Sequence, residues 1–98
     1  MGHHPNFTAQ MIERAKAPVD KPWVLIRDGK VNHLALIITA KGTKSFVWDG
    51  RAQGEKYRRQ LGTWPTMALE TARARAHEIN ALVEARRDPF KEAADAEK

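Results

Sequence analysis

The chain has 98 residues, of which 42% are hydrophobic and 30% are charged, an ordinary composition for a globular domain. This length supports one modest core and is too short for a catalytic domain with a separate substrate domain. The absence of cysteine excludes a disulfide framework, a thiolate zinc site and a cysteine nucleophile. The longest apolar run, 34–38, is far too short to span a membrane, and no signal peptide is recognisable. The lack of cysteine fits the cytoplasmic location that we expect.

The positive charge is unevenly distributed. The 17 basic and 12 acidic residues give a net charge of +5. Segment 41–60 alone carries six basic residues against only Asp49 and Glu55, and so holds +4 of that total. Such a concentration is typical of proteins that bind polyanions, with nucleic acid as the first candidate.

Residues 7–16 predict a short N-terminal helix. Thr8 is suited to cap the first free amides, and Phe7 is spaced to pack against Ile12. Pro18 ends the helix. A helix this short needs tertiary contacts to be stable, so we expect it to lie against another element.

An antiparallel meander of three or four strands is predicted next, over 23–27, 33–40, 44–51 and 55–61. The tight turns between these strands fall at Asp28-Gly29, Lys41-Gly42-Thr43 and Ala52-Gln53-Gly54. In the third strand, Phe46 and Trp48 point to one face, and the other face receives Ser45, Val47, Asp49 and Arg51.

Residues 62–65 are expected to break the sheet, and a long helix should run from about Thr66 to Arg87, where Pro89 ends it. Its apolar stripe consists of Leu69, Ala72, Ala76, Ile79 and Val83. We expect this stripe to pack on one face of the sheet, against Leu34, Leu36, Ile38, Phe46, Trp48 and Leu61. The predicted fold is therefore α+β: a short N-terminal helix, a three- to four-stranded antiparallel β-sheet and a long C-terminal helix packed on one sheet face.

The other face of the sheet is predicted to be basic. Its candidate DNA-binding residues, two of them at a turn, are Lys41, Lys44, Ser45, Arg51, Lys56, Arg58 and Gln60. A two- or three-stranded ribbon fits the B-DNA major groove, where Arg, Lys and Gln read base edges. A sheet face that meets only solvent is the alternative, and the apolar Ile37 and Val47 on this face fit it less well.

Other kinds of site are less well supported. Trp23, Trp48 and Trp64 are candidates for stacking on bases, although Trp48 and Trp64 fit better in the core. His3 and His4 lie in the expected disordered N-terminus. His33 and His77 have no acidic or histidine neighbour three or four residues further on, so we expect no metal site and no cofactor.

The sequence also argues against an enzyme. It has no phosphate-binding loop of the required spacing and no conspicuous pair of carboxylates. Tyr57 lies among Lys56, Arg58 and Arg59, and such cations can lower the pKa of a phenol. A tyrosine nucleophile also needs a pocket and a general acid, which a small meander does not supply. We therefore expect no catalytic residue and no small-molecule substrate.

Several short motifs together resemble one known family. They are 42–47 (GTKSFV), Arg51 with Gly54, 61–65 (LGTWP), Ala72-Arg73 and Asp88-Pro89. As a set they resemble the N-terminal arm-type DNA-binding domain of tyrosine recombinases, the integrases of phages and genomic islands. The resemblance covers about residues 7–91.

This resemblance implies that the sheet enters the major groove of arm-type sites and recruits an integrase to attachment DNA. The catalytic residues of such integrases lie in later domains, so the chain is expected to be an excised N-terminal domain or a free-standing relative. We expect a disordered N-terminus over 1–6, an arm-type DNA-binding domain over 7–89 and a linker or frayed tail over 90–98. The expected partners are double-stranded DNA and other integrase subunits.

The chain departs from the family pattern at several positions. Asn32-His33 replaces a frequent Pro-Gly, and Ile37 replaces a frequent arginine. Asp49-Gly50 stands where the family tends to have a basic and an aromatic residue. Ala68 replaces a frequent serine cap, so Thr66 is expected to cap the long helix instead. These differences reduce the positive charge of the basic face and leave individual base contacts open.

Two alternatives to arm-site recognition remain at this point. One is a stand-alone nucleic-acid-binding regulator or RNA-binding module. The other is a domain that holds recombinase subunits together through the polar face of the long helix.

Overall fold

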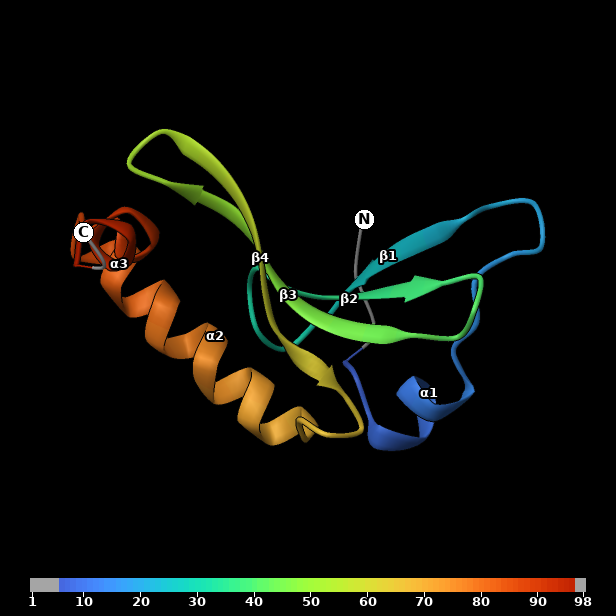
Figure 1. Ribbon diagram of the computed structural model, residues 1–98. Helices are drawn as coiled ribbons and strands as arrows, with labels where there is room; N and C mark the ends of the chain where they lie inside the picture. Colours follow the sequence, from blue (N-terminus) through green and yellow to red (C-terminus); the bar gives the residue numbers. More distant parts are fainter. Residues whose placement is uncertain (1–5, 97–98) are drawn as a thin grey trace.

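The computed structural model of the protein describes residues 6–96, so the expectations for residues 1–5 lie outside the described residues, His3 and His4 among them. The described part is α+β, as predicted, and consists of one four-stranded antiparallel sheet with three helices (Figure 1). In chain order its elements are α1 (Ala9–Arg14), β1 (Trp23–Arg27), β2 (Leu34–Thr39), β3 (Lys44–Ala52), β4 (Glu55–Trp64), α2 (Leu69–Glu84) and α3 (Pro89–Ala96). No helix of this part is long and apolar enough to cross a membrane.

The sheet is a simple meander in the order β1-β2-β3-β4, because strands that follow each other in the chain are neighbours in the sheet. Gly42 and Gly54 adopt φ angles of 94° and 84°, as the predicted turns require. The outer halves of β3 and β4 pair with each other beyond the end of β2, from Asp49–Arg58 to Ala52–Glu55. The β3–β4 hairpin therefore extends past the other two strands (Figure 1).

The last strand continues further than predicted. β4 reaches Trp64, whereas residues 62–65 were expected to break the sheet. Phe46 pairs with Gly62 and Val47 with Gln60, so Leu61 is an extra residue in β4, a β-bulge. The bulge allows β4 to stay paired with β3 beyond this point. The strand ends at Pro65, which has no amide hydrogen to donate.

The hydrophobic core lies between one face of the sheet and the helices, as predicted. The sheet contributes Leu34, Leu36, Ile38, Phe46 and Trp48, all buried. The stripe of α2 packs on them through Leu69, Ala72 and Ala76, with Ile79 and Val83 partly buried at its end. Phe7 and Ile12 belong to the same cluster, and Figure 1 shows α1 and α2 on the same side of the sheet.

Helix α1 starts as predicted and ends sooner. The Thr8 side chain accepts a hydrogen bond from the Met11 amide at 3.0 Å, which confirms it as the N-cap. Ala15 is already extended, with ψ 138°, so the helix stops at Arg14 rather than Lys16. The buried Ile12 then anchors this short helix to the core.

Asp28 and Arg73 form a buried clamp between distant parts of the chain. The Asp28 carboxylate accepts a hydrogen bond from the Phe7 amide at 2.8 Å and lies 3.1 Å from Arg73 Nε. Arg73 also donates to the Phe7 carbonyl oxygen at 2.8 Å. The clamp joins the N-terminal segment, the turn after β1 and α2, so the Ala72-Arg73 motif has a structural role.

Helix α2 is shorter than the predicted Thr66–Arg87. Its N-cap is Ala68, which offers no side-chain hydrogen bond, so the expectation that Thr66 caps the helix was wrong. At the other end Arg86 adopts a left-handed φ of 63°, and the Arg87 amide donates to the Leu82 carbonyl oxygen at 3.0 Å. This turn ends the helix before Pro89 is reached.

A third helix occupies most of the segment expected to be a linker or frayed tail. Asp88 accepts hydrogen bonds from the amides of Phe90 and Lys91, which makes it the N-cap of α3. Pro89 therefore begins α3, a position that proline favours, and α2 has already ended at Glu84. The Phe90 ring lies 5.2 Å from that of Trp48 and 4.7 Å from that of Tyr57, so α3 packs against the hairpin.

Candidate nucleic-acid interface

The face of the sheet opposite α1 and α2, here called the open face, is covered by no helix of the described part. Strand register assigns to it four rows of residues: Leu25–Ile37–Ser45–Thr63, Arg27–Ala35–Val47–Gln60, Asp49–Arg58 and Arg51–Lys56. The first two rows give it an apolar centre, and the last two carry charge along the hairpin. It is therefore a basic face around an apolar patch.

Five of the seven candidate residues share the open face as predicted: Ser45, Arg51, Lys56, Arg58 and Gln60. Arg51 and Lys56 are cross-strand partners, and Arg58 occupies the adjacent row opposite Asp49. All three cations are exposed. Their part in DNA binding stays a prediction, although the fold does bring them side by side.

The two lysines that were predicted to lie at a turn, Lys41 and Lys44, have different positions in the structure. Lys41 is exposed in the β2–β3 turn, at the opposite end of β3 from Arg51. Lys44 alternates with Phe46 and so lies on the helix side of the sheet, where its ammonium donates to the Glu13 carbonyl oxygen at 2.8 Å. Its placement with the open face was wrong, because Lys44 is the first residue of β3 and lies on the same face of that strand as Phe46.

One basic residue of the open face was missed. Arg27 ends β1, and its guanidinium lies 2.6 Å from the Asp49 carboxylate. Arg58 approaches the same carboxylate from β4, with Nε at 3.7 Å. The alternation of β1 alone puts Arg27 on one face with Trp23 and Leu25, but only the β1–β2 register shows that this is the open face.

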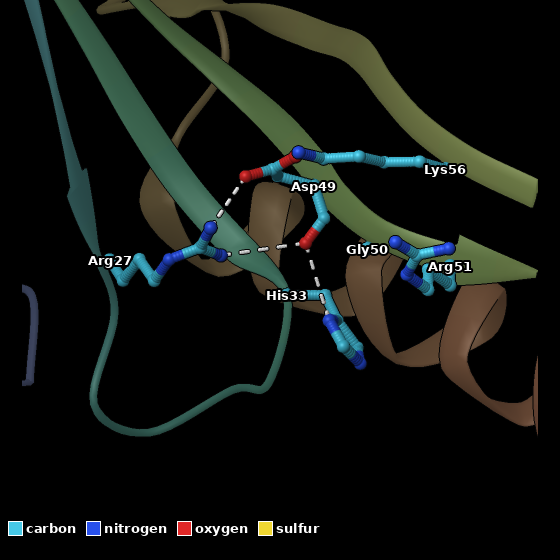
Figure 2. A pocket seen from close by; sticks show the side chains of 6 residues that line it. All are labelled: Arg27, His33, Asp49, Gly50, Arg51 and Lys56. Atoms are coloured by element: carbon cyan, nitrogen blue, oxygen red, sulfur yellow. Dashed lines mark hydrogen bonds and ion pairs between the residues drawn. The ribbon is translucent and has the colours of Figure 1, made fainter.

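A hollow of about 360 Å³ lies beside Asp49, where β3 continues past Leu34, the first residue of β2. Figure 2 shows its lining residues, which are Arg27, His33, Asp49, Gly50, Arg51 and Lys56. The His33 ring fills the space where residue 50 would carry a side chain, since a Cβ on Gly50 would lie 2.5 Å from His33 Nδ1. His33 also adopts a φ of 71°. Two departures from the family pattern, at 33 and 50, therefore fit each other.

The three tryptophans have different environments. Trp48 is buried and donates to the Asn80 side chain at 2.9 Å, and Trp64 packs edge-on against Phe46, so both belong to the core as expected. Trp23 is 45% exposed, and the guanidinium of Arg58 lies 5.5 Å from its ring centre. Trp23 is therefore the tryptophan best placed to contact a ligand at the open face.

Tyr57 does not have the environment of a nucleophile. Its hydroxyl donates to Asp88 at 2.6 Å, and this hydrogen bond, together with burial, raises the pKa of Tyr57 above its ordinary value. Neighbouring Arg59 acts in the other direction and is outweighed. Within residues 6–96, moreover, no three histidine, aspartate or glutamate side chains are grouped so that they could hold a metal ion.

The described residues form a helix-backed antiparallel meander with a basic, helix-free face, a combination that nucleic-acid-binding domains use. The chain belongs to the Arm DNA-binding domain family, found in phage integrases, which it matches over residues 7–96. This domain is a non-catalytic DNA-binding module. A comparison with curated proteins gave no significant match.

Proposed function

We propose that the chain binds double-stranded DNA sequence-specifically through the open face of its sheet. The observation that supports this most is the gathering of accessible cations on or beside that face, namely Arg27, Lys41, Arg51, Lys56 and Arg58. The helices pack on the other face and leave this one accessible. Because the chain belongs to a DNA-binding family, we propose that the polyanion bound by these cations is DNA.

The projecting β3–β4 hairpin is the element that we propose enters the major groove. A two-stranded ribbon fits a groove about 12 Å wide. Arg51, Lys56 and Arg58 would then face the base edges or the adjacent phosphates, with Gln60 and Ser45 further along the same face. Lys41, at the far end of β3, would contact phosphate.

The biological role that we propose is recognition of arm-type sites for a tyrosine recombinase, as in prophage or genomic-island integration. In that role the domain recruits the recombinase to attachment DNA, and other recombinase subunits would be its protein partners. We propose that this DNA binding takes place in the cytoplasm. Family membership supports this role, because arm DNA-binding domains are found in phage integrases.

Salt dependence tests whether the interface is electrostatic. With about four to six cations on phosphates, log K for a labelled duplex should fall against log salt with a slope of about −4 to −5. The duplex is one that the domain selects from a pool of random sequences, here called the selected duplex, and its titration at several salt concentrations gives this slope. A flat dependence would contradict binding through the basic open face.

The same titration, repeated with RNA and combined with a subunit-association assay, separates the alternatives. An RNA-binding module would prefer the RNA, and a subunit-interaction domain would associate with recombinase while binding neither nucleic acid. The exposed side of α2, which such a domain would use, carries both signs of charge at Glu70, Arg75, Glu78 and Glu84. A mixed surface of this kind is typical of a solvated helix face.

A further inference from the structure

Asp49 is a buried acidic residue among the basic residues of the open face. Its side chain is 3% exposed, and it lies on β3 between two arginines that come from other strands. Arg27 of β1 lies 2.6 Å from Oδ2, and Nε of Arg58 of β4 lies 3.7 Å from Oδ1 (Arg27 is shown in Figure 2). One buried carboxylate therefore joins the two sides of the open face.

Asp49 is unsuited to contact DNA itself. Its carboxylate is buried, and its negative charge opposes the approach of phosphates. Oδ1 has no hydrogen-bond partner within the described residues and has Arg58 as its ion-pair neighbour. Burying such a group is unfavourable unless paired cations compensate. Its effect on DNA must therefore pass through the arginines.

The two arginines are held in place and remain accessible. Arg27 donates to the Asp49 carboxylate and, through Nη1, to the Asp49 carbonyl oxygen at 3.5 Å. The guanidinium of Arg58 also makes a cation–π contact with the ring of Trp23. Their side chains are still 41% and 43% exposed. A guanidinium has five N–H donors, so donors remain for a second acceptor.

We propose that Asp49 is a positioning residue that fixes the guanidinium groups of Arg27 and Arg58, so that this pair discriminates guanine from other bases in the major groove. An arginine held in one orientation loses less conformational freedom when it donates to guanine O6 and N7. This inference rests on the proposed DNA-binding function and adds to it which residues read the sequence.

The decisive variant is Asp49→Asn, because a pure charge effect leaves the ratio of affinities for the selected and the scrambled duplex unchanged, whereas loss of positioning lowers it. Removing one negative charge from a DNA-binding face should tighten binding to every duplex if Asp49 acts only through its charge. If Asp49 positions the arginines, the ratio of affinities for the selected and the scrambled duplex should fall about tenfold. Binding to the scrambled duplex should stay equal or become tighter. The melting temperature of the variant shows whether it is folded.

Arg27→Lys tests the same proposal without altering a buried residue. Lysine keeps the charge but lacks the planar fork, so the affinity ratio should fall about tenfold while the salt slope stays unchanged. Arg75→Lys, on the exposed side of α2, is the matched control and should leave the ratio unchanged.

The proposal is overturned if the wild type prefers its selected duplex and Arg27→Lys has the same affinity ratio as the wild type. It is also overturned if folded Asp49→Asn has the same affinity ratio as the wild type. A wild type with no preference among duplexes contradicts the proposed function itself, which keeps the two failures distinct. Should Asp49→Asn fail to fold, Arg27→Lys decides alone.

Discussion

Replacement of Arg73 by alanine should destabilise the fold by about 3–5 kcal/mol, because it leaves the buried Asp28 carboxylate without its partner. Against a total stability of about 5–15 kcal/mol for a domain, this is a large loss. The variant also loses the hydrogen bond from Arg73 to the Phe7 carbonyl oxygen, so the N-terminal segment is released from α2. Thermal or urea unfolding measures the effect.

Arg75→Ala is the matched control for this variant. Arg75 lies on the same helix and is exposed, so its loss should change stability by no more than about 0.5 kcal/mol. Equal unfolding curves for the two variants would show that the Asp28–Arg73 clamp contributes nothing to stability.

Asp28 gives the same clamp a dependence on pH. Burial alone would raise the pKa of this carboxyl, but hydrogen bonds from Arg73 and from the amides of Phe7 and Lys30 outweigh burial and lower it. Because the folded pKa lies below the unfolded one, the stabilisation is complete above about pH 4 and is lost as the pH falls through the folded value. Asp28→Asn should therefore be less stable than the wild type near neutral pH, and the difference should shrink in acid.

Trp48→Ala should cost about 3–5 kcal/mol, since it empties the largest fully buried position of the core. The variant also removes the hydrogen bond to Asn80 on α2 and the ring contact with Phe90 on α3. Both helices should then detach more easily from the sheet. Denaturant unfolding, followed by circular dichroism because the substitution removes a fluorophore, measures the loss.

Comparing the stability of Trp23→Ala with that of Trp48→Ala tests which face of the sheet is the core face. Trp23 is 45% exposed on the open face, so its removal should cost about 1 kcal/mol or less. If Trp23→Ala were the more damaging of the two, the assignment of core and open faces would be reversed.

Most of the sheet could be predicted from the sequence, because glycine turns bound the apolar segment 34–38 and the strand 44–51, in which two large aromatic residues share one face. Phe46 and Trp48 were assigned to the core on this basis, and both are buried. The end of β4 could not be predicted, since a bulge at Leu61 depends on how β3 and β4 pair and leaves no clear signal in either strand.

Helix ends were predicted less well, for local reasons. Pro89 was interpreted only as a terminator, although an aspartate followed by proline is also a common helix start, as Asp88 and α3 demonstrate. α2 ends in a turn in which Arg86 adopts a left-handed φ. This conformation could not be predicted, because residues other than glycine rarely adopt it.

The candidate site was predicted in part. Residues on one hairpin, such as Arg51 and Lys56, could be paired by counting from the Gly54 turn. Arg27 could not, because its position beside Asp49 depends on the register of two further strand pairs. Lys44 is the opposite case, since its shared parity with Phe46 was available in the sequence and was not applied.

The central claim, that the open face binds double-stranded DNA, is tested most directly by two variants with the same change in net charge. Arg51→Gln/Lys56→Gln removes two cations from the open face, and Arg75→Gln/Arg86→Gln removes two exposed cations at α2 and its C-terminal end. Affinity for a selected duplex is measured for both against salt concentration. The open-face variant should lose about tenfold or more in affinity and about two units of salt slope, while the helix variant stays within about threefold of the wild type. Equal losses, or a greater loss in the helix variant, would contradict the open face as the DNA-binding surface.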